Sequence, residues 1–150
     1  MTLKLIDNSI TPEEIQLLAK WRKKVQKEWG ETFRVTFNGT EKWIHTIIDN
    51  PEKMLFFVCV KEKPIGHVGF DKIEDNYCYI GNVIRGRGKS DGSMTKAIQT
   101  LIAISYKFRH GFIYLTTRRK NKKGIEFYKK IGFRRFQRKD NNLIMKYEKN

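Results

Sequence analysis

The feature that most constrains the fold is the segment Met54–Val60, which is apolar at all seven positions. It is rich in aromatic and β-branched side chains, and turn-forming residues lie on either side of it. An apolar run of this length is typical of a β-strand that is covered on both faces. We therefore expect a layered structure around a sheet, with this strand at the sheet centre.

Weaker periodic patterns supply the other elements. Short apolar patterns bounded by turn residues predict six further strands, at residues 3–7, 65–70, 77–84, 112–117, 133–137 and 143–147. Apolar residues at three- and four-residue spacing predict four helices: one from Thr11-Pro12 to Gly30, one capped by Thr40, one from Asp91 to His110-Gly111, and one over 121–131. The order βααβββαβαββ predicts one α/β (α+β) domain over residues 1–150, with a mixed sheet of about seven strands flanked by four helices.

The charge balance indicates an anionic ligand. Lys and Arg number 31 against 16 Asp and Glu, which gives a formal net charge of +15. A positive surface concentrates polyanions, so nucleic acid, an anionic membrane surface or a phosphorylated small molecule would each be attracted. Charge alone does not choose among them, and most individual lysines are also explained as a solvated surface.

Other compositional features argue against several classes of protein. Cys59 and Cys78 lie in apolar stretches without CxxC spacing, so we expect reduced core residues and no metal site. The N-terminal residues contain no apolar run of signal-peptide length, and no segment approaches the length of a membrane span. These observations predict a cytoplasmic protein.

The most informative segment for function lies between a predicted strand and a predicted helix. Three glycines and three basic residues alternate there, in the order Val83, Ile84, Arg85, Gly86, Arg87, Gly88, Lys89, Ser90, Asp91, Gly92. Glycines let backbone N–H groups turn inward, and the helix N-terminus adds partial positive charge, so the segment is suited to hold a pyrophosphate. The alternative is an ordinary glycine-rich turn. A nucleotide-binding P-loop is excluded because Val83 occupies a required glycine position.

Two short motifs resemble those of the GNAT N-acetyltransferase superfamily. Arg85, Gly88 and Ser90 match its Arg/Gln-x-x-Gly-x-Gly/Ala signature, with Ser90 as a departure, and Tyr128 to Phe133 matches Tyr-x-x-x-Gly-Phe. The element order also resembles that of the family, so the likeness covers essentially the whole chain. It implies acetyl-CoA as co-substrate, bound by Asn121, Tyr128 and residues 83–90, with the pantetheine arm between strands 77–84 and 112–117.

The resemblance also implies catalytic roles. Tyr128 would protonate the coenzyme A thiolate as general acid, although a packing role is the alternative, and Asn121 would contact the co-substrate or cap its helix. Strand 77–84 has no carboxylate where many relatives carry a glutamate. The candidate bases are therefore His67, Asp71 and Glu74, and His67 is favoured because its ordinary pKa is near neutral. His45 is a weaker alternative.

The first two predicted helices resemble those of GNAT enzymes that acetylate nucleotide-linked amino sugars. The resemblance consists of the Trp21-Arg22 and Lys42-Trp43-Ile44 patterns. It assigns acceptor contacts to Trp21, Arg22 and Glu74, although both indoles are also explained as core. We expect a small, anionic or nucleotide-linked amine acceptor, bound by a monomer or homodimer. The alternatives are acetylation of a protein or peptide amine, and a non-catalytic module that binds nucleic acid.

Overall fold

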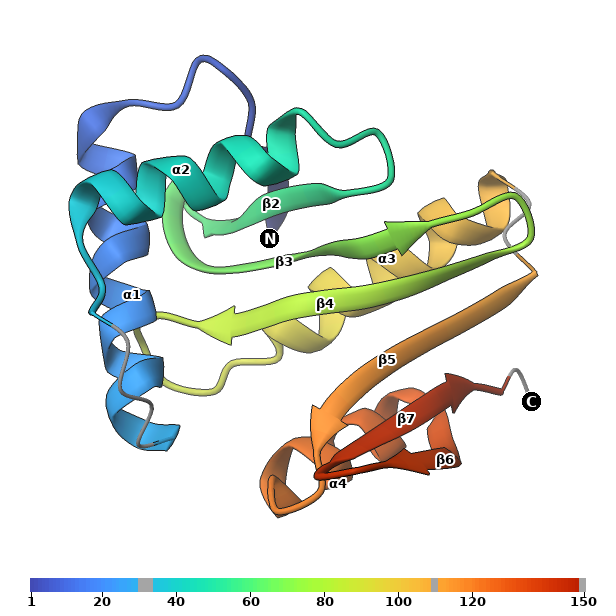
Figure 1. Cartoon of the computed structure of the whole chain (residues 1–150). Helices are drawn as coiled ribbons and strands as arrows, with labels where there is room; N and C mark the ends of the chain where they lie inside the picture. Colours follow the sequence, from blue (N-terminus) through green and yellow to red (C-terminus); the bar gives the residue numbers. More distant parts are fainter. Residues whose placement is uncertain (30–33, 109–110, 149–150) are drawn as a thin grey trace.

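A computed structural model describes residues 1–29, 34–108 and 111–148 and shows a seven-stranded sheet with four helices (Figure 1). The helices are α1 (Pro12–Trp29), α2 (Phe37–Ile48), α3 (Ser93–Lys107) and α4 (Lys122–Ile131). The strands are β1 (Thr2–Leu5), β2 (Met54–Val60), β3 (Lys63–Ile73), β4 (Tyr77–Arg85), β5 (Phe112–Arg118), β6 (Phe133–Lys139) and β7 (Asn142–Tyr147). The predicted element order is confirmed.

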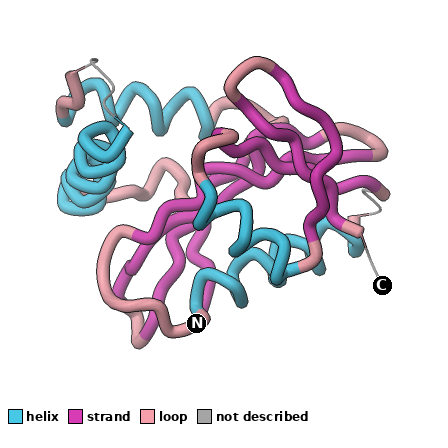
Figure 2. The backbone as a smooth tube through the Cα atoms, turned by 90° about the horizontal axis from the view of Figure 1, so that it is seen from below, coloured by secondary structure: helices cyan, strands magenta, loops and turns pink. Residues whose placement is uncertain are grey.

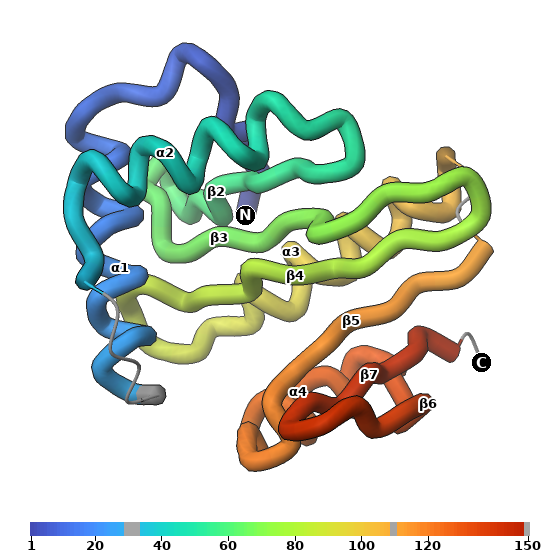
Figure 3. Tube along the Cα trace, viewed as in Figure 1, coloured from blue at the N-terminus to red at the C-terminus, as the bar shows by residue number. Residues whose placement is uncertain are grey.

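The sheet has the strand order β1-β2-β3-β4-β5-β7-β6. Neighbouring strands run antiparallel except β4 and β5, which are parallel and joined through α3. These two strands pair only from Tyr77 to Ile80 on β4 and from Phe112 to Leu115 on β5. Beyond that point they diverge, which the chain trace shows clearly (Figure 3). The divergence opens a gap in the middle of the sheet.

Helices cover both faces of the sheet, as the view from below also shows (Figure 2). Side chains of α1 and α2 form one core with Leu55, Phe57 and Cys59, while α3 and α4 form the other with Phe56 and Val58. Strand β2 thus buries alternate side chains on opposite faces, as its sequence predicted. Its predicted position at the sheet centre was wrong, because it lies beside the edge strand β1 and β4 is the central strand. Burial on two faces depends on the helix layers and not on the distance from the edge.

The β3–β4 pairing is irregular at two points, with one extra residue on β4 near Asn82 and one on β3 at Asp71. His67 pairs with Ile84 and Gly69 pairs with Gly81, so three steps along β4 match two along β3. Asn82 lies in this bulge with φ 53°, a left-handed conformation that Asn tolerates better than most residues. The bulge lies where β4 begins to part from β5, so it shapes the gap.

Two helix boundaries differ from the sequence prediction. Helix α2 begins at Phe37, and its N-cap is Thr36, whose Oγ1 accepts a hydrogen bond from the Gly39 amide at 2.9 Å. Thr40, the predicted cap, is buried within the helix and donates its hydroxyl hydrogen to the Thr36 carbonyl. Helix α3 ends at Lys107, and Phe108 is its C-cap. The predicted helix ends at Gly30 and His110 lie outside the described residues.

Strand limits and cysteines agree more closely with expectation. Strand β1 ends at Leu5, two residues early, whereas β3 continues past Phe70 to Ile73 and so includes Asp71. Both cysteines are buried and free.

None of the described helices has the length and apolarity to cross a membrane. The described residues also contain no group of three or more His, Cys, Asp or Glu side chains arranged to hold a metal ion.

Candidate active site

A cavity of about 200 Å³ lies where β4 and β5 part, and we call it the β4–β5 cavity. Residues of β3, β4, β5 and α4 surround it, so it draws together segments far apart in the sequence. Its lining consists of Asp71, Ile80, Gly81, Asn82, Val83, Leu115, Thr116, Thr117, Arg118, Asn121 and Tyr128. Four predicted site residues, Asp71, Val83, Asn121 and Tyr128, therefore meet in one place.

Asp71 supplies the carboxylate of this cavity. It extends from β3 over Gly81 of β4, where a Cβ would overlap its Oδ2 atom. The side-chain amide of Asn82 donates to Asp71 Oδ1 at 3.0 Å. Desolvation by the surrounding protein raises the pKa of the Asp71 carboxyl, and the charge of Lys53 opposes this only in part. Asp71 is nevertheless exposed on the surface of β3, so contact with solvent limits this effect. A carboxylate is thus present beside β4 although β4 itself carries none, and a raised pKa favours its acceptance of a proton.

His67 has a different environment. Its side chain is 2% exposed, and its ring lies 6.2 Å from the rings of both Trp21 and Trp43. Burial lowers the pKa of His67 to about 4, against a smaller raising effect of its hydrogen bond with the Asn82 carbonyl and a further lowering by Arg22. Since Nδ1 must donate to that carbonyl at 2.5 Å, His67 is neutral and holds the bulge in place. It does not line the β4–β5 cavity, which removes the reason for preferring it to Asp71 as base.

Tyr128 enters the cavity from α4. Its ring packs edge-on against Phe127 and Phe133, with centroids 5.4 and 6.1 Å away. Burial raises the pKa of Tyr128 to about 12, so the phenol stays protonated at neutral pH. Within the described residues the hydroxyl makes no hydrogen bond to protein, which leaves its proton available to a ligand. Tyr128 thus combines the packing role and a position suited to an acid.

Asn121 caps α4, which is one of the two roles predicted for it. Its Oδ1 atom accepts from the Gly124 amide at 3.1 Å, and its Nδ2 atom donates to Thr117 Oγ1 at 3.2 Å. Since it also lines the cavity, its capping role does not exclude contact with a ligand. The hydrogen bond to Thr117 ties the start of α4 to β5.

The loop between β4 and α3 is held by its own side chains. Arg85 donates to Asp91 Oδ1 at 3.1 Å and to the Gly88 carbonyl at 3.3 Å, while Asp91 accepts from the Ser93 amide at the start of α3. The pKa of Asp91 is lowered to about 2, mainly by hydrogen bonds from the backbone and side chain of Ser93 and to a smaller extent by the contact with Arg85. Gly88 has φ 82° and Gly92 has φ 84°, so both use the freedom that glycine gives. The loop therefore presents backbone amides and positive charge at the helix N-terminus.

Trp21 supports this loop from inside the protein. It is 2% exposed, and a Cβ at Gly86 would overlap its indole ring. Arg22 donates to Thr40 Oγ1 at 3.0 Å and lies 4.7 Å from the centroid of Trp43. The Trp-Arg pattern thus packs α1 against α2. Neither Trp21 nor Arg22 lines the β4–β5 cavity. Glu74 follows the last residue of β3, and its Oε1 atom lies 3.7 Å from the Nζ atom of Lys72.

A second hollow adjoins the cavity on the sheet face that α1 and α2 leave uncovered, and we call it the tyrosine groove (Figure 1). It measures about 490 Å³ and is lined by Asp71, Lys72, Tyr77, Tyr79, Thr116, Lys139, Asp140, Asn142 and Ile144. Tyr79 stacks on Tyr114 of β5 at 5.3 Å between ring centroids. Asp71 and Thr116 line both spaces, so the groove leads to the cavity. Sequence analysis missed this groove, although tyrosines two residues apart on β4 were a usable signal.

The family follows from a match between the sequence and a model of known proteins. Residues 18–133 match the acetyltransferase (GNAT) family, which is most of the chain and includes β4, α3, β5 and α4. The chain belongs to the GNAT acetyltransferase family. No curated protein sequence matches it significantly.

Solved structures of GNAT enzymes share this fold at low sequence identity. Campylobacter jejuni N-acetyltransferase PseH is 17% identical, with a TM-score of 0.78 over 99% of this chain and 98% of its own. RimL, a ribosomal L7/L12 α-N-protein acetyltransferase, is 17% identical, with a TM-score of 0.79 over 96% and 90%. FdhC, a nucleotide-linked sugar GNAT, is 16% identical, with a TM-score of 0.72 over 97% and 84%.

As a GNAT enzyme the protein is an acetyl-CoA-dependent N-acetyltransferase, and PseH has also been solved with acetyl-CoA. The residues present fit this co-substrate. The β4–β5 gap exposes backbone beyond the last paired residues, where an extended pantetheine arm can hydrogen-bond. The glycine-containing loop at the start of α3 offers amides to a pyrophosphate.

Proposed function

We propose that this enzyme acetylates the primary amine of a small molecule by direct attack on acetyl-CoA, with a nucleotide-linked amino sugar as acceptor. One observation carries the catalytic part of the proposal: Asp71 and Tyr128 line the same cavity between the diverging strands. The carboxyl of Asp71 has a raised pKa, and the phenol of Tyr128 has a pKa of about 12. One group is therefore suited to take a proton and the other to give one.

The two residues divide the reaction between them. Asp71 accepts a proton from the ammonium form of the acceptor, directly or through water, so that the neutral nitrogen attacks the thioester carbonyl carbon. A new C–N bond forms, the nitrogen gives its second proton to water, and the C–S bond breaks. The thiolate sulfur then takes the phenolic proton of Tyr128, and both residues exchange protons with water before the next turnover. Asn82 holds the Asp71 carboxylate over Gly81 throughout.

The acceptor enters from the tyrosine groove, because that groove meets the cavity at Asp71. Tyr77 and Tyr79 offer aromatic surface for a flat ring. The net charge of +15 favours an anionic acceptor and opposes a polyamine. Similarity to FdhC, a nucleotide-linked sugar GNAT, supports the same class, whereas similarity to RimL keeps a protein N-terminus as the alternative.

An acceptor panel tests the proposal. Purified protein with acetyl-CoA would be offered amino-deoxy nucleotide sugars, free amino sugars, spermidine and short peptides, and release of the free thiol would be followed. We expect the highest kcat/KM with an amino-deoxy nucleotide sugar. A preference for peptides or spermidine would refute this acceptor class while leaving the chemistry intact.

The base assignment is tested by Asp71→Asn, with Asp75→Asn as a matched control. Asp75 is an exposed carboxylate in the turn between β3 and β4 and lines neither the cavity nor the groove. We expect Asp71→Asn to lower kcat about 10²-fold or more, since general-base help is worth ~10²–10⁴. The loss should shrink as the pH rises and more free amine is present. Equal activity in both variants would remove Asp71 from the mechanism.

A further inference from the structure

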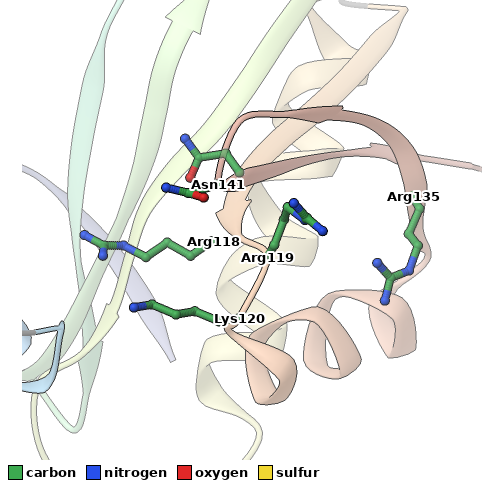
Figure 4. Close-up of a pocket in the computed structure, with 6 residues that line it drawn as sticks. Arg118, Arg119, Lys120, Arg135 and Asn141 are labelled. Atoms are coloured by element: carbon green, nitrogen blue, oxygen red, sulfur yellow. The ribbon is translucent and has the colours of Figure 1, made fainter.

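One hollow of the described protein surface is strongly basic and has no role in the reaction as derived so far. It measures about 790 Å³ and lies between the β5–α4 connection and the β6–β7 hairpin (Figure 4). We call it the arginine pocket. Its lining consists of Arg118, Arg119, Lys120, Arg135, Asn141 and Asn142.

The two walls of the arginine pocket are joined by hydrogen bonds. The backbone amide of Arg119 donates to the Asn141 carbonyl at 2.9 Å, and its guanidinium Nη1 donates to the Asp140 carbonyl at 3.4 Å. In Figure 4 the side chains of Arg118 and Lys120 extend in the same direction, while Arg135 reaches from β6 toward α4. The pocket is therefore a fixed feature of two connected segments.

Charge is unusually concentrated around this pocket. Four of the six lining residues are cationic and none is a carboxylate. Between residues 118 and 139 eleven residues are Lys or Arg, and Glu126 is the only acidic one. Positive charge concentrated on neighbouring residues raises the local concentration of anions. Guanidinium groups bind phosphate through paired hydrogen bonds, which makes phosphate the best matched anion.

The position of the pocket links it to the site of the reaction. Arg118 lines both the arginine pocket and the β4–β5 cavity, and Asn142 lines both the pocket and the tyrosine groove. A molecule that places its amine beside Asp71 can thus place an anionic group against Arg118. The volume of the pocket lies within the range of sites for nucleotide-sized ligands, about 300–1,000 Å³.

We propose that the arginine pocket binds the phosphate groups of the acceptor, as the diphosphate of a nucleotide-linked substrate. This inference rests on the proposed function for its choice of ligand. The loop at the start of α3 shares no residue with the arginine pocket, so the enzyme has two separate phosphate sites, one for acetyl-CoA and one for the acceptor. The transferred acetyl group passes between them at Asp71.

Binding measurements test the pocket independently of turnover. Uridine diphosphate would serve as the acceptor probe, with acetyl-CoA and adenosine 3′,5′-bisphosphate as co-substrate probes, titrated calorimetrically into the wild type, Arg119→Ala and Arg135→Ala. Both arginines line the pocket but not the β4–β5 cavity. Arg138→Ala is the control, since Arg138 is an exposed arginine on the same strand as Arg135 and lines none of these hollows.

We expect each pocket variant to weaken uridine diphosphate about tenfold or more, the effect of losing one charge-assisted contact, and to change acetyl-CoA affinity less than twofold. Arg138→Ala should bind both ligands like the wild type. Unchanged binding of uridine diphosphate in the pocket variants would overturn the proposal. Selective weakening of acetyl-CoA and the bisphosphate would assign the pocket to the co-substrate instead. If the pocket variants bind uridine diphosphate like the wild type but bind a short single-stranded RNA more weakly, the pocket would be assigned to nucleic acid. Because no step requires catalysis, failure of the Asp71 mechanism would leave these results interpretable.

Discussion

Acidification should destabilise the protein through His67, and the size of the effect follows from its burial. The pKa of His67 is about 4 in the folded protein, against an ordinary value of 6.5. As the pH falls, the unfolded chain binds a proton at this residue before the folded chain does. The stability that depends on neutral His67 is therefore present above pH 6.5 and lost progressively between pH 6.5 and pH 4. The difference between the two pKa values corresponds to roughly 3 kcal/mol.

Urea unfolding followed by tryptophan fluorescence at several pH values would measure this loss, with His67→Gln as reference. The amide of the variant does not titrate but can still donate to the Asn82 carbonyl. Carboxylates titrate in both proteins, so their contribution largely cancels in the difference, and the one charged side chain that acts on His67, Arg22, is charged throughout. We expect the wild-type advantage over the variant to shrink by roughly 3 kcal/mol between pH 7 and pH 4. A difference that stays constant over this range would refute the argument that His67 is buried as the neutral form.

Three further substitutions test the site and its support. Tyr128→Phe should keep its thermal stability and acetyl-CoA affinity while kcat falls about 10²-fold, the lower end for an acid that water partly replaces; full activity in a stable protein would assign protonation of the thiolate to water. Gly86→Ala should raise the KM for acetyl-CoA and lower the melting temperature, because the added methyl group overlaps the Trp21 indole. Wild-type values for both would contradict the close packing of Trp21 against Gly86. Arg22→Ala should cost about 1–2 kcal/mol of stability in chemical denaturation, through its lost contacts with Thr40 and Trp43. A raised acceptor KM in a fully stable Arg22→Ala protein would instead restore Arg22 as an acceptor contact.

The element order was predictable because each element carries its own local pattern. The strand β4, the basic glycine loop and the helix α3 follow one another in sequence, and Tyr128 lies at a fixed spacing from Gly132. Neighbouring residues along the chain were enough to predict this strand, loop and helix. The proposed position of acetyl-CoA therefore rests mainly on local sequence.

The catalytic base was harder to choose because its position depends on pairing between strands. An extra residue of β4 at Asn82 and an extra residue of β3 at Asp71 together bring these two side chains into contact, and no pattern within β3 or β4 reveals that register. His67 looked suitable by its ordinary pKa, but the two indoles that bury it come from helices distant in sequence. Thr36 was missed as a cap for a simpler reason, since the Thr36-Phe37-Asn38-Gly39 stretch resembles a turn as much as a helix start.

The overlap between Asp71 and Gly81 makes these two positions interdependent in evolution. The carboxylate on β3 occupies the volume that a side chain on β4 would fill, so only one of the two strands can supply a group at that point. We expect family members with a carboxylate at the position of Gly81 to carry a small residue at the position of Asp71. Moving the base from one strand to the other then requires two substitutions. Adding the new carboxylate first would place two side chains in the same volume, and removing Asp71 first would leave the protein without a base.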